Sequence, residues 1–145
     1  DVEIWEILRF SRWRKSDSNT LLMREGDSDQ RFGIVIDGRV EVSVDGQRVS
    51  EVSYGEVFGE LAYLDEQDHK HMYTVVTTTT TTYLELNPAA LSLATDECQD
   101  AFRRRLVTVV ARRLGSAYRE LAKTGAPAER ITASGFGMEL QLLDN

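Results

Sequence analysis

A succession of short β-branched runs separated by glycine turns constrains the fold of this chain more than any other feature. Between residues 31 and 59 the sequence reads in turn "RFGIVID", "RVEVSV", "QRVSEV" and "GEVFG", and the first two runs alternate with period two. Asp37-Gly38 and Asp45-Gly46 bound these runs. Asp-Gly between alternating runs predicts a hairpin, because both central turn positions need positive φ. The region is therefore expected to form short antiparallel strands.

The segment that starts at Met72 extends this pattern, since β-branched and aromatic residues fill "MYTVVTTTTTTYLEL" throughout. Its threonine run, residues 77–82, predicts a β-ladder in which alternate methyl groups pack and alternate hydroxyls meet water. About eight short strands are expected in all, and many short antiparallel strands indicate a sandwich or a barrel.

Helical patterns flank the β-rich region. Near-helical spacing at the start of the chain joins Val2, Ile4, Trp5 and Leu8. After Asn87-Pro88, where proline suits the first position of a helix, a long apolar stripe consists of Phe102, Leu106, Val109 or Val110, Leu114, Ala117 or Tyr118, and Leu121. Gly125 and Pro127 are expected to end that helix. We predict one folded domain over residues 1–124 and a tail or linker over residues 125–145.

Composition narrows the class of protein. At 145 residues the chain suits one domain with a real core. A formal net charge of −7 argues against binding to nucleic acid, which needs clustered cations. Apolar runs are too short to cross a bilayer, and no signal segment opens the chain. The single cysteine, Cys98, forms no internal disulfide, so a cytoplasmic location is expected.

The segment at residues 54–74, "YGEVFGELAYLDEQDHKHMYT", carries the groups that a small phosphate-bearing ligand needs. Gly59 lets a ligand approach the main chain, because it has no Cβ. Amides at a helix start, here those of Leu61 and Ala62, favour an anion. The Glu60 carboxylate can accept hydrogen bonds from a sugar hydroxyl. These residues predict a nucleotide site, although Glu60 can also cap its own helix and its neighbours can simply pack in the core.

The same residues resemble a known family. "YGEVFGELAYL" is similar to the opening of the phosphate-binding cassette of cyclic nucleotide-binding domains, and the family's order is kept by Gly26, Gly38, Gly55, Gly59 and Glu60. The resemblance runs from about Ile7 to Leu121. It implies a mainly β fold with flanking α-helices, namely a double-stranded β-helix (jelly-roll) barrel with an N-terminal helix and a long C-terminal helix.

The resemblance also implies a function. Such a domain is a regulatory sensor that binds a cyclic nucleotide, cAMP rather than cGMP, and signals through its C-terminal helix to a fused or partner effector. In the family the acid that matches Glu60 binds the ribose 2′-hydroxyl. Gly59 then allows close approach, and the amides of Leu61 and Ala62 face the cyclic phosphate. The long helix is a candidate for pairing two subunits into a homodimer.

One part of the cassette departs from the family. The family places a proline and an arginine about ten residues after the glutamate, followed by small residues and a threonine. Here "DEQDHKHMYT" has neither, and if Thr74 is the family's threonine, Lys70 and His71 are the cations left for the phosphate. A lost charge-assisted contact costs about 1.5–3 kcal/mol, or roughly tenfold to a hundredfold in affinity. Met72 and Tyr73 also replace small residues and can crowd the pocket.

Three alternatives follow from this departure. The first is a degenerate domain of the same fold that serves as an interaction or dimerisation module without nucleotide. The second is a metal site at "HKH", which is disfavoured because His69 and His71 are the only histidines and no third ligand follows. The third is an enzyme on a related barrel, which is disfavoured because no nucleophile–base pair can be placed. No cofactor and no catalysis are expected.

Overall fold

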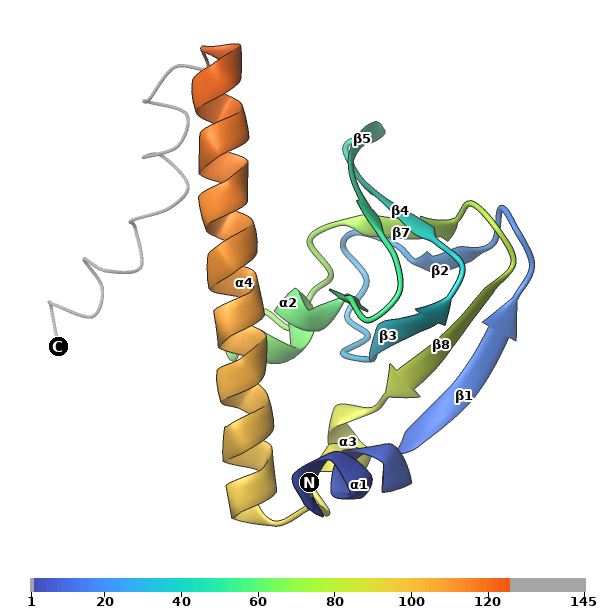
Figure 1. Cartoon of the computed structure of the whole chain (residues 1–145), viewed down its shortest axis with the longest axis vertical. Helices are drawn as coiled ribbons and strands as arrows, with labels where there is room; N and C mark the ends of the chain where they lie inside the picture. Colours follow the sequence, from blue (N-terminus) through green and yellow to red (C-terminus); the bar gives the residue numbers. More distant parts are fainter. Residues whose placement is uncertain (1, 126–145) are drawn as a thin grey trace, which may run out of the picture. The chain divides into compact units, whose positions relative to one another are not determined.

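Eight strands and four helices make up the part of the chain that the computed structural model describes, the backbone of residues 2–125 and the side chains of residues 5–125 (Figure 1). The elements are α1 (Val2–Arg9), β1 (Ser11–Ser16), β2 (Leu21–Met23), β3 (Phe32–Asp37), β4 (Val40–Val44), β5 (Gln47–Val52), β6 (Val57–Phe58), α2 (Glu60–Leu64), β7 (Thr74–Thr77), β8 (Thr81–Leu86), α3 (Pro88–Leu91) and α4 (Asp96–Thr124). The chain divides into two compact units, Asp1–Leu106 and Val107–Asn145, and the first contains every strand described.

The strands form a jelly roll. One four-stranded sheet has the order β1-β8-β3-β6 and the other has the order β2-β7-β4-β5, and all pairs are antiparallel. Successive strands mostly change sheet, so each sheet brings together strands that are far apart in sequence. This arrangement confirms the predicted fold class, a β barrel with flanking helices and a long C-terminal helix.

The two Asp-Gly pairs have different roles. Asp45 and Gly46 have φ of 51° and 78°, and they join β4 to β5 with Val44 opposite Gln47, which is the predicted two-residue hairpin. The hairpin predicted at Asp37-Gly38 is wrong, because β3 and β4 lie in different sheets. Gly38 has φ of 93°, and a Cβ there would collide with the backbone carbonyl of Thr80. Its glycine is therefore required by a crossover between sheets and not by a hairpin.

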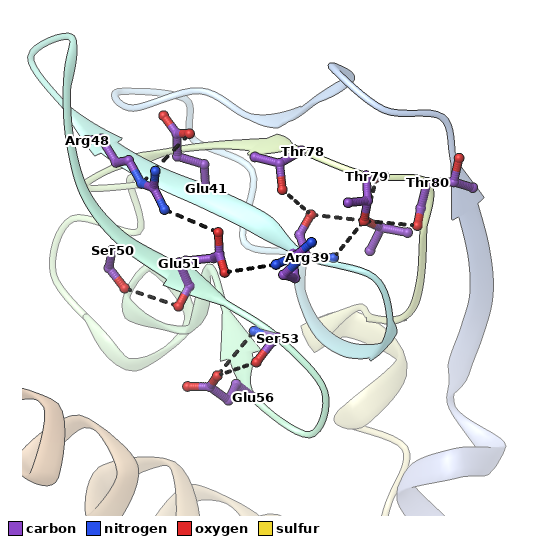
Figure 2. Close-up of polar contacts among 11 residues, drawn as sticks. Arg39, Glu41, Arg48, Ser50, Glu51, Ser53, Glu56, Thr78, Thr79 and Thr80 are labelled. Atoms are coloured by element: carbon purple, nitrogen blue, oxygen red, sulfur yellow. Dashed lines mark hydrogen bonds and ion pairs between the residues drawn. The ribbon is translucent and has the colours of Figure 1, made fainter.

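The threonine run was predicted to form a single β-ladder. This prediction is wrong, because the run is another crossover between the sheets. Thr77 ends β7 in one sheet and Thr81 begins β8 in the other, and both are fully buried. Figure 2 shows how the bend between them, residues 78–80, bonds to the backbone of Arg39: the Thr78 hydroxyl donates to the Arg39 carbonyl at 3.3 Å, and the Arg39 amide donates to the Thr79 hydroxyl at 3.0 Å. The hydroxyls are therefore used to join the two crossovers.

Alternating strand residues fill the barrel. The largest cluster of buried residues consists of Val35, Val40, Val42, Val52, Phe58, Val75 and Tyr83, with Leu22, Met23 and Tyr73 packed against it. Phe58 and Tyr83 contact edge to face with 5.5 Å between ring centroids. Tyr73 is thus a core-facing residue although it precedes strand β7.

The predicted helix signals are confirmed where they can be tested. Asn87 accepts a hydrogen bond from the Ala89 amide at 3.0 Å, with Pro88 at the first position of α3. Helix α4 begins at Asp96, and Gly125, with φ of 71°, follows its last residue. Cys98 and Leu106 are buried, whereas Leu114, Tyr118 and Leu121 in the second unit are exposed.

Residues 126–145 lie outside the described residues, so the predicted tail stays a prediction. Within residues 2–125, we find no helix with both the length and the apolar character that a membrane crossing requires.

Candidate functional site

Gly59 and Glu60 lie where strand β6 gives way to helix α2. Gly59 has φ of 79°, and a Cβ at this position would collide with the sulfur of Met23. The positive φ favours glycine, which turns the chain from strand into helix, whereas the flexible Met23 side chain can move away from an added Cβ. Glu60, Leu61 and Ala62 then form the first turn of α2, where amides have no partner within the helix. These four residues lie along one short turn at a helix start, and their contacts with a ligand remain a prediction.

The Glu60 side chain is buried and is engaged by a tyrosine. Its exposed fraction is 1 %, and one carboxylate oxygen, Oε2, accepts a hydrogen bond from the Tyr73 hydroxyl at 2.9 Å. The same hydroxyl accepts a hydrogen bond from the Gly59 amide at 2.6 Å. One phenol oxygen thus joins the Glu60 carboxylate, which was predicted to bind the ribose, to the amide of Gly59, which was predicted to let the ligand approach.

The sequence analysis expected Met72 and Tyr73 to crowd the pocket, but it did not foresee the hydrogen bonds from Tyr73 to Gly59 and Glu60. The signal was present, because bulky residues at positions 72 and 73 stand where the family has small ones. The structure separates the two: Met72 is 52 % exposed, whereas Tyr73 packs against the buried core. Residues 72 and 73 precede strand β7, so sequence alternation alone did not settle which of them faces inward.

The three cations at residues 69–71 have different environments. Lys70 is exposed, and a ring nitrogen of His69, Nδ1, lies 3.4 Å from the Ala62 carbonyl oxygen. His71 is buried, with an exposed fraction of 4 %, and its Nε2 atom has no hydrogen-bond partner within the described residues. Of the two cations predicted for the phosphate, only His71 is held inside the fold.

The backbone fixes His71 against the loop between β2 and β3. Its amide donates to the Asp27 carbonyl at 2.9 Å, and its carbonyl accepts from the Gly26 amide at 2.8 Å. Thr74 also anchors this loop, because its hydroxyl accepts a hydrogen bond from the Glu25 amide at 3.1 Å. The predicted ligand contact of Thr74 remains a prediction, since its hydroxyl is used here by the protein.

Burial lowers the pKa of His71 below its usual 6.5, and nearby charges modify the effect. The acids Asp29, Asp27 and Glu60 oppose the lowering, while Arg31 adds to it. Arg31 pairs with Asp29 at 2.6 Å, and this hydrogen bond keeps the pKa of Asp29 below its ordinary value. We expect a mostly neutral imidazole near pH 7.

The premise of a metal site at "HKH" is not met. Neither histidine lies in a strand, because β7 begins at Thr74, and His69 has a positive φ of 38°. The two rings therefore do not share a strand face as the metal hypothesis required. No group of three His, Cys, Asp or Glu side chains suited to a metal ion occurs within residues 5–125.

A chain of aromatic contacts leads away from the cassette. Tyr63 of α2 stacks on Phe32 with centroids 5.0 Å apart, and Phe32 stacks on Phe102 of α4 at 5.9 Å. Arg103 lies 5.1 Å from the centroid of the Tyr63 ring and 3.5 Å from a Glu66 carboxylate oxygen. Helix α2, which begins at Glu60, is therefore packed through Phe32 onto the first turns of α4.

A separate cavity of about 280 Å³ lies among α1, the first turns of α4 and the sheet that contains β3 and β8. Its lining is mostly apolar and includes Leu8, Leu86, Cys98 and Phe102. Ser11 and Arg105 are the polar members of this lining, and none of the predicted site residues belongs to it.

Comparison with known proteins identifies the class to which this fold and cassette belong. The family model of the cyclic nucleotide-binding domain matches residues 13–95, more than half of the chain. The chain belongs to the cyclic nucleotide-binding domain family. Sequence comparison with curated proteins gave no match.

Several solved structures share the fold. A cyclic nucleotide-binding domain from Methylobacillus flagellatus is 21% identical, with a TM-score of 0.71 over 84% of this chain and 72% of that one. The second cyclic nucleotide-binding domain of a protein kinase A regulatory subunit, bound to Sp-2Cl-cAMPS, is 17% identical, with a TM-score of 0.66 over 88% and 81%. The regulatory subunit of a cAMP-independent protein kinase A from Trypanosoma brucei is 21% identical, with a TM-score of 0.61 over 72% and 40%.

Proposed function

We propose that this domain is a regulatory module that binds a cyclic nucleotide at Gly59 and Glu60 by displacing the Tyr73 hydroxyl. The observation that carries the proposal is the phenol oxygen between the Gly59 amide and the Glu60 carboxylate. A ribose hydroxyl can donate to Glu60 as the phenol does, and a phosphate oxygen can accept from Gly59. The exchange leaves neither group without a partner, so the cassette can alternate between a tyrosine and a ligand.

We call the cassette closed when the Tyr73 hydroxyl bonds to Gly59 and Glu60, and this closed form lowers the affinity for ligand. The two hydrogen bonds, one of them to a carboxylate, contribute about 2–4 kcal/mol to the closed state, which corresponds to an open fraction of roughly one part in 30 to one in 900. Because only the open form binds, the apparent dissociation constant rises by the same factor. We expect cAMP to bind in preference to cGMP, but more weakly than it binds to the same cassette without the tyrosine. Ligand binding then shifts a population of closed and open forms.

The aromatic contacts support transmission of that change to helix α4. Displacement of Tyr73 alters the partners of Glu60, the first residue of α2. Helix α2 is packed through Tyr63 and Phe32 onto Phe102 of α4. We therefore propose that the helix carries the signal to an effector that is fused or associated. A cytoplasmic location, a regulatory and not a catalytic role, and pairing of two copies through the helix belong to the same proposal.

One observation favours a second candidate function. The contacts of Tyr73 already satisfy both cassette groups, as in a domain that works without nucleotide. A neighbour of the same fold is the regulatory subunit of a protein kinase A described as cAMP-independent, so the fold also occurs in a regulator that does not respond to cAMP. In this case the exposed apolar residues Leu114, Tyr118 and Leu121, spaced four and three residues apart on α4, provide a surface for a partner or a second copy.

Isothermal titration with cAMP, cGMP and a cyclic dinucleotide separates the two candidates. The titrations compare the wild type with Tyr73→Ala, which removes the hydroxyl that bonds to Gly59 and Glu60. Tyr54→Ala is the control, since Tyr54 is 77 % exposed. We expect cAMP to bind the wild type, and to bind Tyr73→Ala about 30- to 900-fold more tightly. If neither protein binds any of these ligands at millimolar concentration, the nucleotide proposal is wrong and the interaction module takes its place.

A further inference from the structure

We propose that His71 is a titratable anion contact, so that nucleotide binding is coupled to the uptake of one proton and strengthens as pH falls. The inference rests on the proposed function and concerns its regulation. It begins from the imidazole of His71, which is 96 % buried and whose Nε2 atom lacks a partner within the described residues. A buried polar atom without a hydrogen bond costs about 1–3 kcal/mol, which calls for an explanation. One such explanation is that a ligand supplies the missing hydrogen-bond partner.

The position of the ring is set by the fold. The backbone of His71 forms hydrogen bonds to Asp27 and Gly26 in both directions, at 2.9 and 2.8 Å, so this residue cannot leave without breaking the pairing. Its neighbours on the same segment do not compete for the role. Lys70 is exposed, and the His69 ring lies against the carbonyl of Ala62.

The charges that face His71 come from two elements. The loop between β2 and β3 provides Asp27, Asp29 and Arg31, and helix α2 provides Glu60. Asp29 and Arg31 are paired and act on the pKa of His71 in opposite directions, with the effect of Asp29 the larger of the two. In the ligand-free form burial outweighs the remaining acids and keeps the pKa of His71 low, so that the ring is mostly neutral near pH 7.

A phosphate in contact with the His71 ring changes the balance between the neutral and the protonated imidazole. The cyclic phosphodiester carries a negative charge, which favours the protonated imidazole and raises the pKa of His71. Nε2 then bears a proton and donates it in a charge-assisted hydrogen bond to a phosphate oxygen. Because the bound form holds one more proton than the free form, the association constant rises up to about tenfold for each unit that pH falls between the two pKa values of His71. A permanently charged arginine gives no such dependence.

The test is isothermal titration of the whole chain with cAMP at pH 6, 7 and 8, in pairs of buffers that differ in ionisation enthalpy. His71→Gln keeps a hydrogen-bonding group that does not titrate, and His71→Arg supplies a fixed charge. His69→Gln is the matched control, since the sequence has two histidines. If the wild type binds too weakly, the same series is made in the Tyr73→Ala background.

We expect uptake of close to one proton per ligand and an affinity that increases as pH falls, both in the parent and in His69→Gln. Both effects should vanish in His71→Gln and in His71→Arg, with binding weaker in the first variant and stronger in the second. Binding without proton uptake, or an unchanged pH dependence in His71→Gln, would overturn this inference alone. Absence of binding in the parent and in Tyr73→Ala at every pH would overturn the proposed function and this inference with it.

Discussion

Removal of a single oxygen atom tests the role of Tyr73. In Tyr73→Phe the ring stays in the core, but the bonds to Gly59 at 2.6 Å and to Glu60 at 2.9 Å are lost. A hydrogen bond to a carboxylate contributes about 1.5–3 kcal/mol and a neutral one about 0.5–1.5 kcal/mol. The Glu60 carboxylate, at 1 % exposure, cannot regain water without movement of the fold. We expect the free energy of unfolding to fall by about 2–4 kcal/mol.

This loss is large enough to measure in two ways. For a domain of about 100 residues, 1 kcal/mol shifts the Tm by roughly 4 °C, so the expected decrease is about 8–16 °C. Urea unfolding followed by circular dichroism gives the free energy directly. Tyr54→Phe is the control, because Tyr54 is exposed and a surface change of this kind stays within about 0.5 kcal/mol. A Tyr73→Phe protein as stable as this control would refute the closed cassette.

Ligand affinity provides a second readout of the same change. If the phenol holds the cassette closed, its removal destabilises the closed form more than the open one. Tyr73→Phe should then bind cAMP more tightly than the wild type although it is less stable. A variant that loses stability and gains no affinity would indicate that the hydroxyl supports the fold without competing with a ligand.

Three further predictions concern the fold and its pH dependence. Gly38→Ala should lower the free energy of unfolding by more than about 2 kcal/mol, as a core defect does, because its Cβ would collide with the Thr80 carbonyl. Gly55→Ala should cost only about 1 kcal/mol, because Gly55 has a positive φ but open space around it. Equal losses in urea unfolding would contradict this prediction. Thr77→Val should cost about 2–3 kcal/mol, since the Thr77 hydroxyl bonds to Asp17 and Thr20 at 2.6 and 2.8 Å, and a neutral result would show that these bonds add little. The pKa of His71 is lower in the folded protein than its usual 6.5, so the unfolded chain binds more protons at acidic pH. Stability should therefore rise as pH increases to about 6.5 and level off above it, and His71→Gln should remove this increment whereas His69→Gln should keep it.

Local signals in the sequence were sufficient for the helices and for one turn. Asn87-Pro88 and Gly125 are conformational signals that act within a few residues, so they could be assigned without the rest of the fold. Asp45-Gly46 formed the expected hairpin for the same reason. The cassette residues Gly59 to Ala62 also follow from local chemistry, because the positive φ of Gly59 and a helix start are properties of that short segment.

Pairing between distant segments was not available from the sequence. Asp37-Gly38 has the composition of a hairpin, yet β3 pairs with β8 and β4 with β7, so this glycine serves a crossover. The threonine run has the composition of one ladder, but it divides between two sheets at the bend bonded to Arg39. Composition sets the preference for extended backbone, while the partner of each strand depends on which surfaces can be buried together.

The sequence by itself determined a short-stranded β fold between helices and a glycine-glutamate turn at the start of a helix. Only the tertiary structure decided which side chains contact that turn. It brings Tyr73 from 13 positions along the chain to Glu60, and it buries His71 while it leaves Lys70 exposed. The physical reason is that burial and hydrogen-bond partners depend on the sheets closing around a core, and no local residue pattern encodes which side chain then fills the space beside a buried carboxylate.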